Sequence, residues 1–311
     1  MPLNVRPVVP SRLTGRKGHS AQRAPRSVIG GYIALTKPRI IELLLITTVP
    51  TMVVAADGWP DTWLVIATLI GGSLAAGGAN AINMYVDRDI DALMERTRTR
   101  PLVTGLIKPR NALVFALVLE VLAFAVLWTW ANLLSAVLAL SATLFYVFIY
   151  TLWLKRTSKQ NIVIGGAAGA VPVLVGWAAV TNSLAWTPWL LFLLIFLWTP
   201  PHFWALAIRH EDDYRAAGVP MLPVVESREK VLASMIRYTV ALVAASLAVV
   251  PVAETGLVYL VTAVVLGAIF LGGTIALARS TSASASMRLF SFSISYISLL
   301  FVGLTVDVFV S

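Results

Sequence analysis

One oxygen-rich stripe in the sequence has the residue types and the spacing of a cation site. Asn83, Asp87 and Asp91 recur at every fourth position, so on a helix they lie along one face. Neighbouring carboxylates on that face lie about 6 Å apart and repel by about 3 kcal/mol at an effective dielectric constant near 20. Hard oxygen ligands with an incomplete coordination shell favour magnesium that is held jointly with a phosphate. The stripe therefore predicts a magnesium–phosphate site.

A second polar stripe begins in the run 198–204, which reads Trp-Thr-Pro-Pro-His-Phe-Trp. On one continuous helix, His202, Arg209 and Asp213 would point in similar directions. A kink is expected at the two prolines of the run, because an internal proline removes a backbone hydrogen bond. The stripe offers an imidazole for ligation or proton transfer. A histidine that is hydrogen-bonded inside a helical bundle is the ordinary alternative.

A third group of candidates is basic and directly follows an apolar run. The family resemblance described below implies that such cations lie beside a diphosphate and offset the charge of the leaving group. Membrane topology alone also accounts for bases at this place, so both interpretations stay open. The group consists of Lys155, Arg156 and Lys159, and weaker candidates at the start of another apolar run are Lys37, Arg39 and Glu42.

Composition indicates what kind of chain must position these groups. Of 311 residues, 58% are hydrophobic and 13% are charged, and the mean hydropathy is +0.83. Soluble domains carry about 25% charged residues, so the composition predicts a polytopic membrane protein. The absence of cysteine excludes disulfides, thiolate metal sites and a cysteine nucleophile.

Nine apolar segments have the length of about 20 residues that a helix needs to cross the hydrocarbon layer. The predicted fold is therefore all-α, with a nine-helix transmembrane domain over residues 32–311. Turn-forming residues separate the segments, and tryptophans cluster near their ends as in an interfacial belt. The segments are 38–56, 62–86, 110–130, 133–153, 162–180, 186–208, 231–251, 256–278 and 289–309.

The basic residues set the orientation of the predicted helices. The net charge of +9 is compatible with nucleic acid or with a membrane surface as partner. When the connections are numbered alternately, all 24 Lys and Arg fall on one side of the membrane, which favours the lipid bilayer over nucleic acid. By the positive-inside rule, the N-terminus and the basic loops are cytoplasmic and the C-terminus lies outside. Two inner connections, 88–110 and 209–237, are long and mix acids with bases, as functional loops do.

Residues 1–31 form a predicted basic tail with six Lys and Arg, four prolines and no acidic residue. This composition also fits a mitochondrial transit peptide, so the mitochondrial inner membrane is the alternative location. The prolines argue against an amphipathic helix. We therefore favour a disordered cytoplasmic tail on a protein of the bacterial plasma membrane.

The first stripe and the loop after it resemble the first aspartate-rich motif of the UbiA superfamily. The matching residues are Asn83-x-x-x-Asp87-Arg88-x-x-Asp91 and then Glu95-Arg96-Thr97-x-x-Arg100-Pro101-Leu102. Members of this superfamily are intramembrane prenyltransferases, nine-helix bundles that use magnesium to bind an allylic diphosphate. Many quinone-type members have Asp directly after the Asn. This chain has Met84 there, a difference that bears on the ligand count of the metal.

The second stripe is similar to a haem-directed branch of the same superfamily, and the similarity covers essentially the whole chain. It rests on Pro-Pro-His-Phe-Trp at 200–204 and Gly-Val-Pro-Met-Leu-Pro at 218–223. It implies transfer of the farnesyl group of farnesyl diphosphate to a vinyl group of protohaem IX, which gives haem O and diphosphate. His202 would then ligate the iron, hold a propionate or transfer a proton. A haem A synthase or a terminal oxidase would receive the product.

The resemblance also implies a role for each candidate residue. Magnesium would neutralise the diphosphate, with a second ion or Arg209 acting from the Asp213 side. Aromatic faces would stabilise the allylic cation. The candidate catalytic residues are Asn83, Asp87, Asp91, Lys155, His202 and Asp213; the candidate metal ligands are Asn83, Asp87, Asp91 and Asp213; the substrate-binding candidates are Arg88, Arg100, Arg156, Arg209, Tyr150 and Trp204.

Two other functions are open to a chain with these features. A prenyltransferase that acts on a quinone precursor or on chlorophyllide is disfavoured by His202, which stands where such relatives carry an aspartate. A cation-coupled transporter predicts broken helices or polar residues near mid-bilayer on several helices. The polar candidates here gather at one membrane face instead. For the loop after Asp87, a solvated face with surface ion pairs is the plain alternative.

Overall fold

The computed structural model describes residue 25 and residues 27–280 and 282–311, which form a helical bundle without a strand in these ranges. Eight of its helical segments are long and apolar enough to cross a membrane. A further helix, α2, has 19 residues, within the range of about 17–25 that a crossing needs. The long segments are α2 (Pro38–Ala56), α3 (Thr62–Val86), α5 (Pro109–Trp130), α6 (Leu133–Leu144) continued by η1 (Phe145–Leu154) and α7 (Lys155–Thr157), α8 (Asn161–Thr181), α9 (Trp186–Arg209), α12 (Arg228–Val252), α13 (Leu257–Ala278) and α14 (Ala283–Val310).

The predicted nine-helix membrane bundle is confirmed, and most helix ends lie within a few residues of the prediction. The largest difference is at α14, which begins at Ala283 although its segment was predicted over 289–309. Polar caps set several of the ends, because the first backbone amides of a helix need acceptors. Asp61 accepts from Leu64 N at 2.8 Å at the start of α3, and Asn132 accepts from Ser135 N at 2.9 Å at the start of α6.

The predicted boundary between tail and bundle, at residues 31 and 32, falls inside α1 (Val28–Thr36). The Ser27 hydroxyl accepts a hydrogen bond from Gly30 N at 3.1 Å, so the helix begins four residues before the predicted boundary. The rest of the predicted tail, residues 1–24 and 26, lies outside the described residues.

Small residues let the helices approach closely in the half of the bundle that contains α3, α5 and α8. A Cβ on Gly78 would lie 3.0 Å from the Ala116 carbonyl oxygen, and one on Gly166 would lie 2.8 Å from the Thr199 methyl. At these two positions a glycine therefore serves close helix packing. The other half has a large apolar core between α9, α12, α13 and α14. Asp307 of α14 caps α13 by accepting from Tyr259 N at 2.9 Å.

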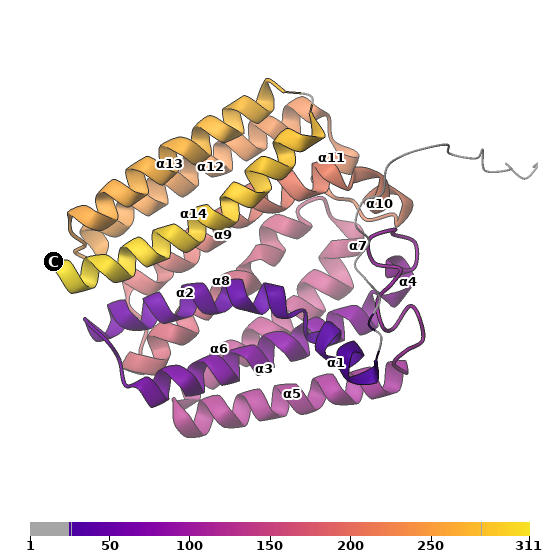
Figure 1. The fold of residues 1–311 in the computed structure, drawn as a ribbon, viewed down its shortest axis with the longest axis horizontal. Coiled ribbons are helices and arrows are strands. Elements are labelled where there is room, and N and C mark those ends of the chain that lie inside the picture. Colours follow the sequence, from indigo (N-terminus) through magenta and orange to yellow (C-terminus); the bar gives the residue numbers. More distant parts are fainter. Residues whose placement is uncertain (1–24, 26, 281) are drawn as a thin grey trace, which may run out of the picture.

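One end of the bundle gathers the short helices, at the right of Figure 1. The opposite end holds the C-terminus and, at the adjoining helix ends, exposed tryptophans such as Trp59, Trp128 and Trp186. The arrangement fits a membrane protein with an interfacial belt on one side and a polar cap on the other. Besides α1 and α7, the cap contains α4 (Arg88–Asp91), α10 (Glu211–Ala216) and α11 (Leu222–Val225).

Candidate active site

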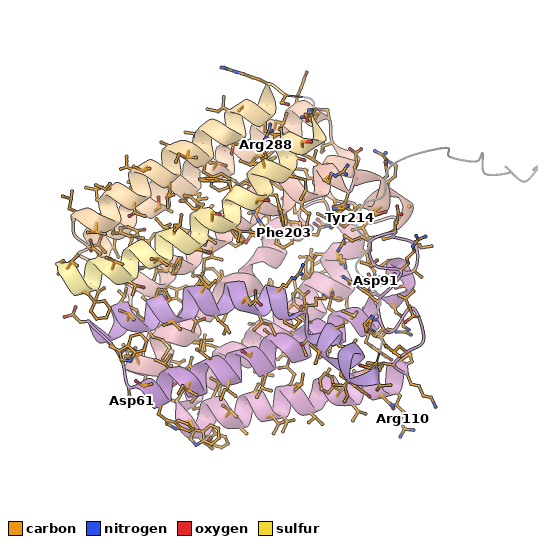
Figure 2. The ribbon with its side chains drawn as sticks, in the orientation of Figure 1. Asp61, Asp91, Arg110, Phe203, Tyr214 and Arg288 are labelled. Carbon is orange, nitrogen blue, oxygen red and sulfur yellow. The ribbon has the colours of Figure 1, made fainter. Side chains whose placement is uncertain are left out.

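The first stripe keeps its helical spacing although the helix is interrupted at Asp87. That residue ends α3, and α4 follows directly with Asp91 N donating to Asp87 O at 2.8 Å. Asn83, Asp87 and Asp91 are 3%, 0% and 1% exposed, so the stripe faces into the bundle. Asp91 lies at the end with the short helices in Figure 2. The stripe is thus buried and is not a solvated face.

Asp87 is the most heavily contacted carboxylate of the stripe. Its Oδ2 accepts from Asn83 Nδ2 at 2.8 Å and from the Lys155 ammonium. The Arg156 guanidinium lies 3.7 Å from Oδ1, too far for a hydrogen bond. Oδ1 is buried and accepts no hydrogen bond from the described part of the chain. The two predicted basic candidates Lys155 and Arg156 therefore do meet this carboxylate.

Asp91 repeats the same pattern one turn further on. Its Oδ2 accepts from Arg100 Nη1 at 2.6 Å, and Thr97 Oγ1 donates to its backbone carbonyl at 2.8 Å. Its Oδ1 is also buried and without a hydrogen bond within the described residues. A buried carboxylate oxygen without a partner is unfavourable unless a cation or a donor completes it. The free oxygens of Asp87 and Asp91 therefore fit the first ligands of a divalent cation.

Lys37 joins this cluster from another part of the chain. It lies between α1 and α2 in the left-handed backbone region, with φ of 52°, and its ammonium donates to Asn83 Oδ1 at 2.8 Å. Burial, and then the charges of Arg100 and Lys155, hold the pKa of Lys37 well below its usual range. The sequence offered only a weak signal for Lys37, a base at the start of an apolar helix on the side that carries the motif.

A π-helical segment, η1, carries two tyrosine rings and a threonine that contacts Asn83, and the basic pair Lys155 and Arg156 follows it directly in α7. Thr151 accepts from Asn83 Nδ2 at 3.1 Å and donates to Tyr146 O, five residues earlier, at 2.8 Å. Tyr150 stacks on Tyr146 with a ring distance of 5.3 Å. A Cβ at position 165 would lie 2.3 Å from the Tyr150 ring, so Gly165 leaves the space that this ring occupies. π-Helical turns are rare and are frequently found at functional sites.

Arg156 of α7 and Arg88 at the start of α4 have different surroundings. Arg156 donates two hydrogen bonds of 2.7 Å to Asp89. These bonds are the main reason why the pKa of Asp89 is lowered to about 2. Arg88, predicted to bind substrate, is exposed and lies 4.7 Å from the ring of Tyr85. It also donates to the Tyr85 carbonyl at 2.6 Å. Its described contacts thus lie on its own helix turn and away from Asp87.

The second predicted stripe does not lie on one helix. α9 runs through both prolines to Arg209, the chain turns at His210, and Asp213 lies in the separate helix α10. Asp213 Oδ1 accepts from Glu95 N at 3.2 Å, which ties α10 to the loop of the first stripe. Within the described residues, no three His, Cys, Asp or Glu side chains gather as a metal-ligand set. Asp213 therefore does not join Asp87 and Asp91 in such a group here.

His202 is buried between two aromatic rings. Its imidazole stacks on Trp198 at 4.1 Å and on Phe290 of α14 at 4.5 Å. Its Nδ1 shares a 2.6 Å hydrogen bond with Ser293 Oγ, which in turn donates to Phe290 O at 2.6 Å. Because the serine proton is used there, the proton of the imidazole is assigned to Nδ1 and Nε2 keeps its lone pair. Neither Phe290 nor Ser293 was singled out in the sequence.

The two remaining candidates of the second stripe face other parts of the bundle. Trp204 lies in the large core, edge to face with Tyr238 of α12 at 5.5 Å. Arg209 lines a cavity of about 530 Å³ together with residues of α14. The structure thus brings Asn83, Asp87, Asp91 and the basic groups together. It gives Trp204 and Arg209 different neighbours.

The fold and the buried stripe are those of a class of membrane prenyltransferases. The chain belongs to the UbiA prenyltransferase family, whose sequence model matches residues 44–300. Two relatives within this family share about half of their residues with this chain. A Protoheme IX farnesyltransferase of Clavibacter michiganensis subsp. michiganensis is 51% identical over 294 residues, 92% of this chain and 96% of that protein. One of Frankia alni is 54% identical over 281 residues, 89% of this chain and 97% of that protein.

Solved structures support the fold. A digeranylgeranylglyceryl phosphate synthase superposes with a TM-score of 0.75 at 18% identity, over 90% of this chain and 98% of that chain. A UbiA homolog from Archaeoglobus fulgidus bound to DMAPP and Mg²⁺ gives a TM-score of 0.63 at 17% identity, over 89% of this chain and 99% of that chain. At these identities the likeness concerns the architecture of the bundle.

Proposed function

We propose that this chain transfers the farnesyl group of farnesyl diphosphate to a vinyl group of protohaem IX, forming haem O and releasing diphosphate. The observation that carries the proposal is the pair of buried, unpartnered carboxylate oxygens on Asp87 and Asp91, set among four basic side chains. Relatives about half identical over most of the chain bear the corresponding name. The family membership supports the same class of reaction.

Asp87 and Asp91 are the proposed ligands of Mg²⁺, since the free oxygen of each is available to a cation. Asn83 orients Asp87 through a 2.8 Å hydrogen bond, and its own carbonyl oxygen already accepts from Lys37. When bound, the metal would neutralise the diphosphate and favour its departure. Because two protein carboxylates do not fill the shell of Mg²⁺, the diphosphate oxygens would supply further ligands.

The basic side chains have a second role in this proposal. Lys155 and Arg100 pair with the carboxylates in the structure. Once a cation satisfies the carboxylates, both groups, together with Lys37, can donate to the diphosphate oxygens instead. Such donors stabilise the negative charge that develops as the leaving group departs. The cluster therefore holds the charges needed for ionisation at one place before the substrate enters.

The reaction then follows from the charges and from the apolar surroundings. The bond between C1 of the farnesyl group and its diphosphate oxygen breaks, and the electron pair leaves with diphosphate. Tyr146 and Tyr150 present stacked aromatic faces that can stabilise the allylic cation. The vinyl group attacks C1 to form a carbon–carbon bond. The cation left beside the porphyrin takes the oxygen of a water molecule, whose proton passes to a base, for which His202 Nε2 is the candidate.

The proposed site faces the cytoplasm of a bacterial cell, with the chain spanning the plasma membrane. Asp91 lies at the end of the bundle that carries the short helices (Figure 2), and the basic side chains of Arg100 and Lys155 pair with Asp91 and Asp87 there. This end corresponds to the side that the positive-inside rule assigns to the cytoplasm. The C-terminus would then lie outside. Transfer of the product to a haem A synthase or a terminal oxidase is part of the same proposal.

A direct assay tests the function. Purified protein in detergent is incubated with protohaem, farnesyl diphosphate and Mg²⁺, and the pigments are analysed by mass spectrometry. We expect a product heavier than protohaem by one farnesyl group and one hydroxyl. Loss of the product with EDTA and its return with Mg²⁺ would support the cation. Turnover of a quinone precursor without any turnover of protohaem would contradict the proposal.

A further inference from the structure

An open cavity of about 530 Å³ lies between the cytoplasmic ends of α9 and α14. Arg209 is the last residue of α9, and Arg288 lies near the start of α14, labelled in Figure 2 toward the end of the bundle with the short helices. The site proposed for the diphosphate uses Asn83, Asp87 and Asp91 with the basic side chains around them, and none of these residues lines this cavity. The lining residues are Arg209, Ser284, Met287, Arg288 and Ser291.

The chemistry of the lining favours an anion. It contains two guanidinium groups and two hydroxyl groups, and none of the five lining residues is acidic. Guanidinium groups bind carboxylates and phosphates through paired hydrogen bonds of defined geometry. The distribution of charge along the chain explains why arginines lie on this side of the membrane. It does not explain why two of them, from helices far apart in sequence, line one cavity.

The same two helices hold an aromatic cluster deeper in the bundle. His202 lies seven residues before Arg209 on α9, about 10 Å along the helix axis. On α14, Phe290 and Ser293 contact His202, and Ser291 lines the cavity. Phe203, labelled in Figure 2, is 36% exposed beside this cluster. The helix pair thus combines a cationic opening with flat apolar groups one to two turns below it.

We propose that this cavity binds the two carboxylates of the porphyrin substrate, with Arg209 and Arg288 as their partners. Protohaem is a flat apolar ring that carries both carboxylates at one edge, which matches a cationic opening above aromatic side chains. This inference rests on the proposed function, since it assigns a subsite to the acceptor of that reaction. The phosphate of an anionic lipid headgroup has similar chemistry and is the competing source of the anion.

The test compares protohaem with protohaem dimethyl ester, in which both carboxylates are blocked. Each is titrated into purified wild-type, Arg288→Gln and Arg288→Lys protein in neutral detergent, with binding followed by haem absorbance. We expect Arg288→Gln to raise the Kd for protohaem about tenfold, the effect of losing one charge-assisted hydrogen bond. Arg288→Lys should have a smaller effect. The ester should bind weakly, with the same Kd in wild type and in Arg288→Gln.

The matched control is Arg237→Gln. Arg237 is an exposed arginine on α12 that bonds to Ser234 and does not line the cavity. Its replacement should leave both Kd values unchanged. The KM for farnesyl diphosphate should also be unchanged in Arg288→Gln, because the diphosphate site uses other residues. Native mass spectrometry of wild type and Arg288→Gln from the same lipid mixture measures the bound phosphatidylglycerol.

Three outcomes would overturn the inference. An unchanged Kd for protohaem in Arg288→Gln would exclude a carboxylate contact. An equal loss of affinity for protohaem and for the ester would show that Arg288 affects binding without contacting the carboxylates. Loss of bound phosphatidylglycerol with an unchanged Kd for protohaem would assign the cavity to lipid. A wild-type enzyme that binds protohaem through Arg288 but forms no farnesylated product would instead contradict the proposed function.

Discussion

The Lys37 ammonium donates to Asn83 Oδ1 at 2.8 Å, and this hydrogen bond joins the start of α2 to the last turns of α3. The amide of the same asparagine donates to Asp87 and to Thr151. The Asn83 side chain thereby accepts a hydrogen bond from a base through Oδ1, and it donates through Nδ2 to a carboxylate and to a hydroxyl of η1. The relationship explains why an amide suits this position: a carboxylate has no N–H to donate to Asp87.

Lys37→Met should raise the KM for farnesyl diphosphate and lower kcat, because it removes a hydrogen-bond donor beside the proposed diphosphate site. Lys37→Arg supplies N–H donors at the same place and should recover part of the activity. Steady-state kinetics with farnesyl diphosphate as the varied substrate measure both effects. If Lys37→Met and Lys37→Arg lost activity equally while the thermal midpoint fell, Lys37 would serve the helix junction rather than the diphosphate.

Asp87→Ala should abolish product formation while the protein stays folded in the membrane. Removing one preorganised electrostatic group costs about 10²–10³-fold in kcat, and here a metal ligand is lost as well. Product formation is measured at saturating protohaem over a range of Mg²⁺ concentrations. Asp212→Asn is the control, since that side chain is 88% exposed. Full activity of Asp87→Ala would remove the basis for the metal assignment.

His202→Ala should impair use of protohaem more than binding of farnesyl diphosphate, because its contacts are with Trp198, Phe290 and Ser293 and not with the carboxylate stripe. Separate KM values for the two substrates give the comparison. Ser293→Ala removes the partner of Nδ1 without opening a large cavity, and it should show a milder form of the same defect. Equal loss for both substrates would indicate a structural histidine.

Glu226 gives a pH dependence of stability. Hydrogen bonds from Lys159, the larger cause, and from Lys230 lower the pKa of Glu226. These ion pairs therefore stabilise the protein at pH values above the usual pKa of a glutamate. Their contribution is lost as the pH falls through the lowered pKa. Glu226→Gln should therefore reduce the thermal midpoint slightly at pH 7, and the difference should vanish in acid. A difference that persisted at low pH would point to lost packing.

The sequence predicted the bundle and the first stripe well because both depend on local pattern. Apolar length defines the helices, and the four-residue spacing from Asn83 to Asp91 survives the break at Asp87. The prediction that the second stripe lies on one helix was wrong. The chain turns at His210, so Asp213 in α10 no longer shares a helix face with His202 in α9. Lys37 and Ser293 come from distant segments, and no local spacing indicates that they meet Asn83 and His202.

Gly165→Ala should lower kcat, because a Cβ at that position would lie 2.3 Å from the Tyr150 ring and must displace it. Tyr150 stacks on Tyr146 close to Thr151, so the displaced ring would no longer face the allylic cation correctly. Overpacking of this kind costs about 1–3 kcal/mol of stability. Gly169→Ala on the same helix is the matched control, since a Cβ there meets no atom within 4 Å. Activity and thermal midpoint are measured for both variants. Gly165→Ala with normal kcat would show that the position of the Tyr150 ring does not matter for transfer.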